Sequence, residues 1–219
     1  MSGKLSSELF TIDAPSVGLT LRMAWLGAGL AVFGVSLALL VRARLGLDPW
    51  DVLNQGIALR LRIQMGWVVD AVGVVVLLAW IPLHQRVGVG TACNVVVVGL
   101  VVNGALDLIP RVEGLTARCF MLAGAILLNG LATSFYIGAG LGPGPRDGLM
   151  LGLATRGHSV RSVRTLVELS VLAVGVVLGG TVGIGTVAYA LAIGPIVHFS
   201  LPRLTLTCPL KSVMQKGEE

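Results

Sequence analysis

The sequence predicts an all-α polytopic membrane protein with six transmembrane helices, arranged as two inverted three-helix repeats with one short extra helix each. Composition is the first reason, because 55% of the 219 residues are hydrophobic and only 12% are charged, far from the range of soluble domains. The second reason is a set of apolar runs close to the ~20 residues that a membrane helix needs. The third is an internal repeat, which makes residues 1–219 one membrane domain.

The repeat is carried by a motif of Leu, Gly, Pro and Asp that occurs twice, at an offset of 96 residues. We call Leu45–Asp51 the first signature and Leu141–Asp147 the second signature. After one deleted residue a Gly-x-Gly-Thr element also recurs, at 88–91 and 183–186. These recurring motifs divide the chain into repeat 1, at about 22–110, and repeat 2, at about 118–202. Polar tails are expected at 1–21 and 203–219.

Six apolar segments are expected to cross the membrane. They are continuously apolar rather than alternating, which favours helices over the strands of a β-barrel. Trp residues flank the second segment, as is typical of membrane interfaces. The expected spans are 23–41, 67–82, 88–109, 118–136, 163–178 and 184–201.

Each repeat is also expected to hold a short helix that begins within its signature. In repeat 1, Asp48 can cap a helix that has Pro49 at its first position and Asp51 in its first turn. Roughly 12–14 residues precede Arg60, or about 20 Å of helix, which is too short to cross a bilayer. The helix therefore lies in the interface or enters the membrane and returns, and residues 138–156 repeat it.

Three spans per repeat is an odd number, so repeat 2 must enter the membrane upside down relative to repeat 1. If the N-terminus is inside, ten Lys and Arg residues lie on the inner side and six on the outer side. The positive-inside rule therefore predicts cytoplasmic N- and C-termini.

Inversion would bring the N-terminal ends of the two short helices together near the middle of the membrane. Such ends carry unpaired N–H groups and a partial positive charge, and many transporters build their sites from them. The candidate substrate- or ion-binding residues are Asp48, Pro49, Trp50, Asp51, Pro145, Arg146, Asp147 and Glu168.

Asp51 and Asp147 are the candidate proton or cation ligands, and Trp50 and Arg146 are expected to shape or gate the entrance. A simpler alternative is that the aspartates only cap interfacial helices, with Pro and Gly setting the turns. Glu168 has a simpler alternative too, because Arg164 lies four residues earlier and can pair with it.

Other polar residues within or beside the apolar runs have the same two interpretations. They either contribute to a site or form ordinary hydrogen bonds and headgroup contacts. They are Asp70, Asn94, Asn103, Asp107, Asn129, Tyr189 and His198. The Gly-x-Gly-Thr elements lack the Lys of a phosphate-binding loop, so they favour helix starts and close packing.

Several classes of protein are disfavoured. The three cysteines fit no metal-binding spacing and no Ser-His-acid set is present, so we expect no enzyme, no metal and no cofactor. The net charge of +5 comes from Lys and Arg residues beside the apolar runs. These residues favour lipid headgroups rather than nucleic acid as their partners.

The paired Leu-Gly-x-x-Pro-x-Asp and Gly-x-Gly-Thr elements resemble those of the YczE/YitT family of bacterial integral membrane proteins, over about residues 20–202. The resemblance implies a multi-pass protein of the bacterial plasma (inner) membrane in which transport is suspected. Leu47 and Asp48 replace the Pro-Gly of the second signature, so we expect the two sites to differ.

The predicted function is therefore a transporter or channel for a small solute or ion, embedded in the lipid bilayer and open to assembly as a homo-oligomer. The alternative is a non-transporting membrane scaffold or accessory factor for a partner protein. A polar cavity between the signatures would favour transport, whereas a sealed interior with a large exposed apolar face would favour the scaffold.

Overall fold

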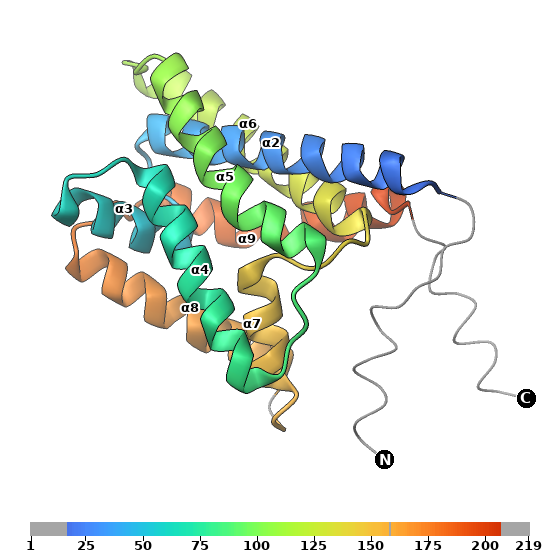
Figure 1. The fold of residues 1–219 in the computed structure, drawn as a ribbon. Coiled ribbons are helices and arrows are strands. Elements are labelled where there is room, and N and C mark those ends of the chain that lie inside the picture. Colours follow the sequence, from blue (N-terminus) through green and yellow to red (C-terminus); the bar gives the residue numbers. More distant parts are fainter. Residues whose placement is uncertain (1–16, 158, 207–219) are drawn as a thin grey trace, which may run out of the picture.

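The computed structural model describes residues 17–157 and 159–206, and this part of the chain is all-helical (Figure 1). Most of both expected polar tails, including Cys208, lies outside the described residues. The helices are α2 (Leu19–Ala43), α3 (Pro49–Leu61), α4 (Met65–Leu83), α5 (Val89–Leu108), α6 (Leu115–Gly138), α7 (Pro145–Ala154), α8 (Val160–Val177) and α9 (Ile184–Leu204).

The helices follow the sequence repeat in order and in length. In each unit a long helix is followed by a short one and then by two long ones, so α2 to α5 correspond to α6 to α9. The expected all-α class is confirmed. The helices extend beyond two expected boundaries, because α2 starts at Leu19 and α9 ends at Leu204, inside the segments assigned to the tails.

Five helices, α2, α4, α5, α6 and α9, are long and apolar enough to cross a membrane. The expected sixth span does form a helix, α8, but it carries Arg161, Arg164 and Glu168 within its 18 residues. These charges keep α8 out of the apolar group, and a sixth span stays a prediction.

The core is centred on α2 and α6, which lie against each other, with α5 packed on α2 and α9 packed on α6 (Figure 1). Small residues allow the close approach of these helices. A Cβ on Gly34 would lie 2.7 Å from the Cβ of Val101, and one on Gly130 would lie 2.4 Å from Cγ2 of Ile196. These two contacts are equivalent under the repeat, so the same small-residue packing is used twice.

Two arginines show that α2 and α6 run antiparallel. Arg22, near the start of α2, donates from Nε to the carbonyl oxygen of Ala139, just past the end of α6 (2.8 Å). Arg118, near the start of α6, donates from Nε to the carbonyl oxygen of Ala43 at the end of α2 (2.7 Å). Each arginine thus satisfies a carbonyl group, and complements the dipole, at the C-terminal end of the other helix.

The short helices pack across the repeat boundary, α3 on α8 and α7 on α4. Gly175 of α8 lies directly against α3, where a Cβ would be 2.6 Å from the backbone nitrogen of Leu53. The equivalent residue in repeat 1 is Trp80, whose buried ring covers Gly148 of α7. A tryptophan ring therefore separates α7 from α4, whereas α3 and α8 are in direct contact.

Candidate substrate site between the two signatures

Each signature packs against the Gly-x-Gly-Thr element of the other repeat. Gly90 donates its N–H to the carbonyl oxygen of Leu141 (2.8 Å), and Gly185 donates to Leu45 (2.7 Å). Gly46 has a φ of 117°, a conformation that favours glycine. The two elements also start α5 and α9, so their expected role in helix starts and packing is confirmed.

The two short helices start in different ways. Oδ1 of Asp48 accepts the N–H groups of Trp50 (2.9 Å) and Asp51 (3.0 Å), with Pro49 at the first helical position. This is the expected N-cap. Helix α7 starts instead at Gly144, which has no side chain to cap it. The expected difference between the two signatures therefore appears at the caps.

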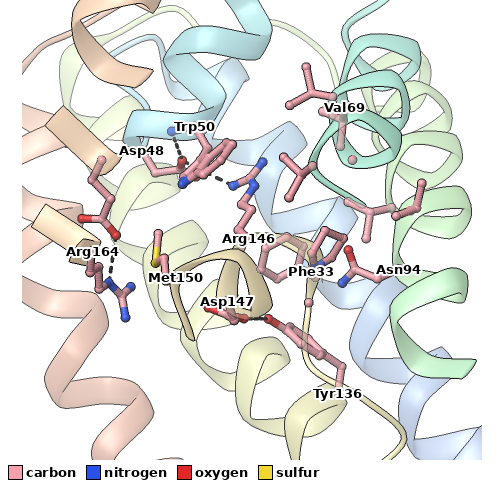
Figure 2. A pocket seen from close by; sticks show the side chains of 18 of the residues that line it. Phe33, Asp48, Trp50, Val69, Asn94, Tyr136, Arg146, Asp147, Met150 and Arg164 are labelled. Atoms are coloured by element: carbon pink, nitrogen blue, oxygen red, sulfur yellow. Dashed lines mark hydrogen bonds and ion pairs between the residues drawn. The ribbon is translucent and has the colours of Figure 1, made fainter. Parts of the chain in front are cut away.

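Arg146 of α7 connects the two signatures (Figure 2). Its Nη2 lies 3.0 Å from Oδ1 of Asp51, and its Nη1 lies 3.6 Å from Oδ1 of Asp48. Its guanidinium also lies 5.4 Å from the ring centroid of Trp50, within the range of a cation–π contact. Trp50 and Arg146 are equivalent positions of the repeat, so the two copies meet each other at the centre of the protein.

The other two aspartates of the signatures are not caps. Asp51 is 1% exposed, and its Oδ1 accepts hydrogen bonds from Nδ2 of Asn54 (2.9 Å) and from Arg146. Asp147 accepts a hydrogen bond from the Tyr136 hydroxyl at Oδ2 (3.0 Å). The alternative that all three aspartates only cap helices is therefore wrong for Asp51 and Asp147.

Burial sets the electrostatics around Asp48, which lies in the connection between α2 and α3. Burial raises the pKa of its carboxyl well above the usual value. The neighbouring Asp51 raises the pKa of Asp48 further, and the Arg146 guanidinium lowers it. A like charge and burial together outweigh a single cation.

A cavity of about 110 Å³ lies between the signatures, and every described helix or its cap contributes to its wall. Aromatic side chains line part of it, and Figure 2 shows Arg146 and Asp147 among them. The charged residues of the wall are Asp48, Arg146, Asp147, Arg164 and Glu168. With Asp51 behind Arg146, four carboxyl groups face two guanidinium groups, an excess of negative charge if all are ionised.

The arrangement brings most of the candidate residues together. The cavity wall includes Asp48, Trp50, Pro145, Arg146, Asp147 and Glu168. Asp51 lies behind the wall, and Pro49 only starts α3. The local alternative for Glu168 is confirmed, because Nε of Arg164 lies 2.8 Å from its Oε1. A role of these residues in binding stays a prediction.

Two tyrosines complete the site. Tyr136 lines the cavity and holds Asp147, but nothing in its local sequence distinguishes it from an interfacial aromatic residue. Tyr189 is one of the polar residues within the apolar runs, and it too lines the cavity. Its hydroxyl donates to Oδ1 of Asn129 (2.8 Å), whose Nδ2 donates to Ser36 (2.9 Å).

The remaining polar residues divide between the two interpretations. Asn94 lines the cavity. Asn103 and Asp70 accept the backbone N–H groups of Gly66 (2.8 Å) and Gly99 (2.9 Å), and so join α4 to α5. Asp107 and His198 are exposed and lie outside the cavity wall.

Sequence comparisons place the chain among proteins of similar length. The chain matches the family of unknown function DUF6198 over residues 20–202. It is 40% identical over 173 residues to an uncharacterized protein of Haemophilus influenzae, covering 78% of this chain and 79% of the relative. It is 31% identical over 190 residues to the uncharacterized membrane protein YczE of Bacillus subtilis, covering 84% and 87%. The uncharacterized protein YyaS of Bacillus subtilis is 24% identical over 192 residues, covering 83% and 93%. No solved structure matches the chain.

Proposed function

The chain belongs to the DUF6198 family, in line with its resemblance to YczE, and from this premise we propose that it is a transporter or channel for a small solute or ion. It is a multi-pass membrane protein, with five helices apolar enough to cross a bilayer among the described residues and a relative named as a membrane protein. The proposed binding site is the cavity between the two signatures.

The observation that carries the proposal is a charged cavity that lies among mostly apolar helices and is built in part from the N-terminal ends of α3 and α7. A charged side chain near the centre of a bilayer costs at least ~2.5 kcal/mol, and such residues usually mark substrate or ion pathways. A scaffold does not require charged residues in its interior, so the cavity favours transport over the scaffold alternative.

The proposal includes six spans in two inverted repeats, with α8 as the sixth. The antiparallel contact of α2 with α6 supports opposite orientations of the two units. The pairing of Arg164 with Glu168 lowers the cost of placing α8 in the membrane. In this arrangement one repeat rocks against the other around the central cavity, and both termini lie on the cytoplasmic side of a bacterial inner membrane.

The charge of the cavity indicates the class of solute. The Arg164–Glu168 pair is neutral, and Asp147 has a neutral hydroxyl as its hydrogen-bond partner. An excess of carboxyl groups favours a positively charged solute over an anion. Alkali cations and small amines are therefore the first solutes to test.

The experiment is solute-driven current or uptake in proteoliposomes that contain the purified full-length chain. Alkali cations, small amines and small carboxylate anions are applied in turn, and we expect a response to at least one cationic solute. Asp147→Asn should reduce this response by about tenfold or more, because the bound solute loses its interaction with the Asp147 carboxylate. A hydrogen bond to a charged group contributes ~1.5–3 kcal/mol. Asp107→Asn is the matched control, since Asp107 is exposed at the end of α5. No response to any solute, or equal losses in both variants, would contradict the proposal.

A further inference from the structure

Two buried carboxyl groups share one guanidinium group at the centre of the protein. We infer that the Asp48–Asp51 pair binds one exchangeable proton, held by Asp48, the carboxyl group that lies farther from Arg146. The inference deepens the proposed function, and its link with transport rests on that function. Proton binding itself can be measured without any solute.

The first argument is the hydrogen bonding of the two carboxyl groups. Oδ1 of Asp48 accepts two backbone N–H groups, and Oδ1 of Asp51 accepts from Asn54 and Arg146. The second oxygen of each group, Oδ2, is buried and has no hydrogen-bond partner among the described residues. The two residues are only 3% and 1% exposed, so neither oxygen lies at the protein surface. A buried acceptor left unpaired is costly, and more so when it carries charge.

The second argument is the charge balance. Arg146 lies closer to Asp51 (3.0 Å) than to Asp48 (3.6 Å), so Asp51 has the better counter-ion. Asp48 would then be a second negative charge in the same buried cluster, and two carboxylates that share a site do not both ionise readily. A proton taken from the solvent onto Oδ2 of Asp48 removes the excess charge. It also gives a hydrogen to one of the two unpaired oxygens.

The third argument concerns the other ionisable groups around the pair. Arg146 is the one cation within ion-pair distance of Asp48 or Asp51 in the described part of the chain. Helix α4 contributes valines and Gly73 to the cavity wall, α5 contributes Asn94 and valines, and α2 contributes Phe33. The remaining ionisable groups of the wall come from α6, α7, α8 and α9, and they are Tyr136, Asp147, Arg164, Glu168 and Tyr189. Arg164 is paired with Glu168, and Asp147 would only add negative charge.

The fourth argument is that capping alone does not require a carboxyl group at this position. Helix α7 starts at Gly144, which is equivalent to Asp48 in the repeat, without any side-chain cap. Only repeat 1 therefore has the second acid, and Arg146 comes only from repeat 2. The proton site is a place where the two repeats differ.

The test is infrared spectroscopy of the purified full-length protein in lipid, titrated with acid and base. The carbonyl stretch of a protonated carboxyl group is separate from that of a carboxylate. At pH 7 we expect one such component that is lost in both Asp48→Asn and Asp51→Asn, because the remaining acid then pairs with Arg146. Arg146→Gln should instead add a second protonated carboxyl. Asp70→Asn is the control, since Asp70 lies in α4 and bonds to Gly99, and this variant should keep the component. Elution as a single species in size-exclusion chromatography verifies that each variant is folded.

Three results would overturn the inference. One is the absence of the component from the wild type at pH 7, and another is its persistence in folded Asp48→Asn. The third is a component that appears in choline buffer and disappears in sodium buffer at the same pH, because a sodium ion would then occupy the pair. A protein that shows the component but moves no solute would contradict the proposed function and leave the proton site intact.

Discussion

The contact between Trp80 and Gly148 yields a prediction about what positions α7 beside the cavity. A Cβ on Gly148 would lie 2.0 Å from Cζ2 of Trp80, 2.4 Å from Cη2 and 2.8 Å from Cε2. Trp80 is 1% exposed, and its Nε1 donates to the carbonyl oxygen of Pro145 (3.0 Å). Because ordinary carbon contacts are about 3.5–4.0 Å, the ring must move by roughly 1.5 Å to admit one methyl group. That movement would break its hydrogen bond.

We therefore expect Gly148→Ala to destabilise the protein by about 2–3 kcal/mol, the upper part of the range for overpacking. Trp80→Leu should cost roughly 2–4 kcal/mol, somewhat less than the ~3–5 kcal/mol for truncation of an aromatic residue to Ala. In the double variant the smaller Leu leaves room for the new methyl group. Its destabilisation should then fall short of the sum by about 1–2 kcal/mol, within the range measured for residues in contact.

The assay is reversible unfolding of the purified protein in mixed micelles with increasing SDS, followed by circular dichroism. Gly104→Ala is the control, because a Cβ there has no neighbour within 4 Å, and we expect no loss of stability. Destabilisation in the double variant that equals the sum of the single values to within ~0.5 kcal/mol would refute the proposed steric coupling.

Three further predictions concern the cavity and the orientation of the repeats. Arg146→Gln should reduce stability more at pH 8 than at pH 5 in the same SDS assay. Buried carboxyl groups without a cation bind protons more tightly in the folded state than in the unfolded state, so stability falls as pH rises. An equal loss of stability at both pH values would argue against this. Asp48→Ala should cost about 1 kcal/mol or more through loss of the N-cap, whereas Asp48→Asn should keep most of the capping contribution, as thermal unfolding of the two variants can compare. Single cysteines at Arg60 and Arg156, in a background without the three native cysteines, should react with an impermeant thiol reagent from opposite sides of the membrane, and labelling from the same side would contradict the inverted repeat.

The sequence predicts the helices well because their signals are local or periodic. The 96-residue offset and the apolar runs place the eight described helices in order, and the Asp-Pro pair at 48–49 identifies the N-cap of α3. Length and hydropathy alone do not decide whether α8 crosses the membrane, because its charged N-terminal half keeps it out of the apolar set. Its helical character was predictable, but its position relative to a bilayer depends on what it packs against.

The partners of the site residues could not be predicted, because they come from distant parts of the chain. Arg146 and Asp51 are 95 residues apart in sequence, and the repeat places them at different positions of the two signatures. The Tyr136–Asp147 hydrogen bond joins two helices whose relative angle is set by packing. Asp51 and Asp147 therefore look identical in the motif but have different partners, a cation for one and a phenol for the other.

The exchange of arginines between α2 and α6 has a consequence for synthesis of the chain on the ribosome. The C-terminal end of α2 receives its hydrogen bonds from Arg118, and the end of α6 receives them from Arg22. Repeat 1 therefore emerges and enters the bilayer with one helix end incomplete, and it must wait for the start of α6 to be made. The first half of the chain cannot complete its native contacts alone, so insertion of the second half is also the step that finishes the first.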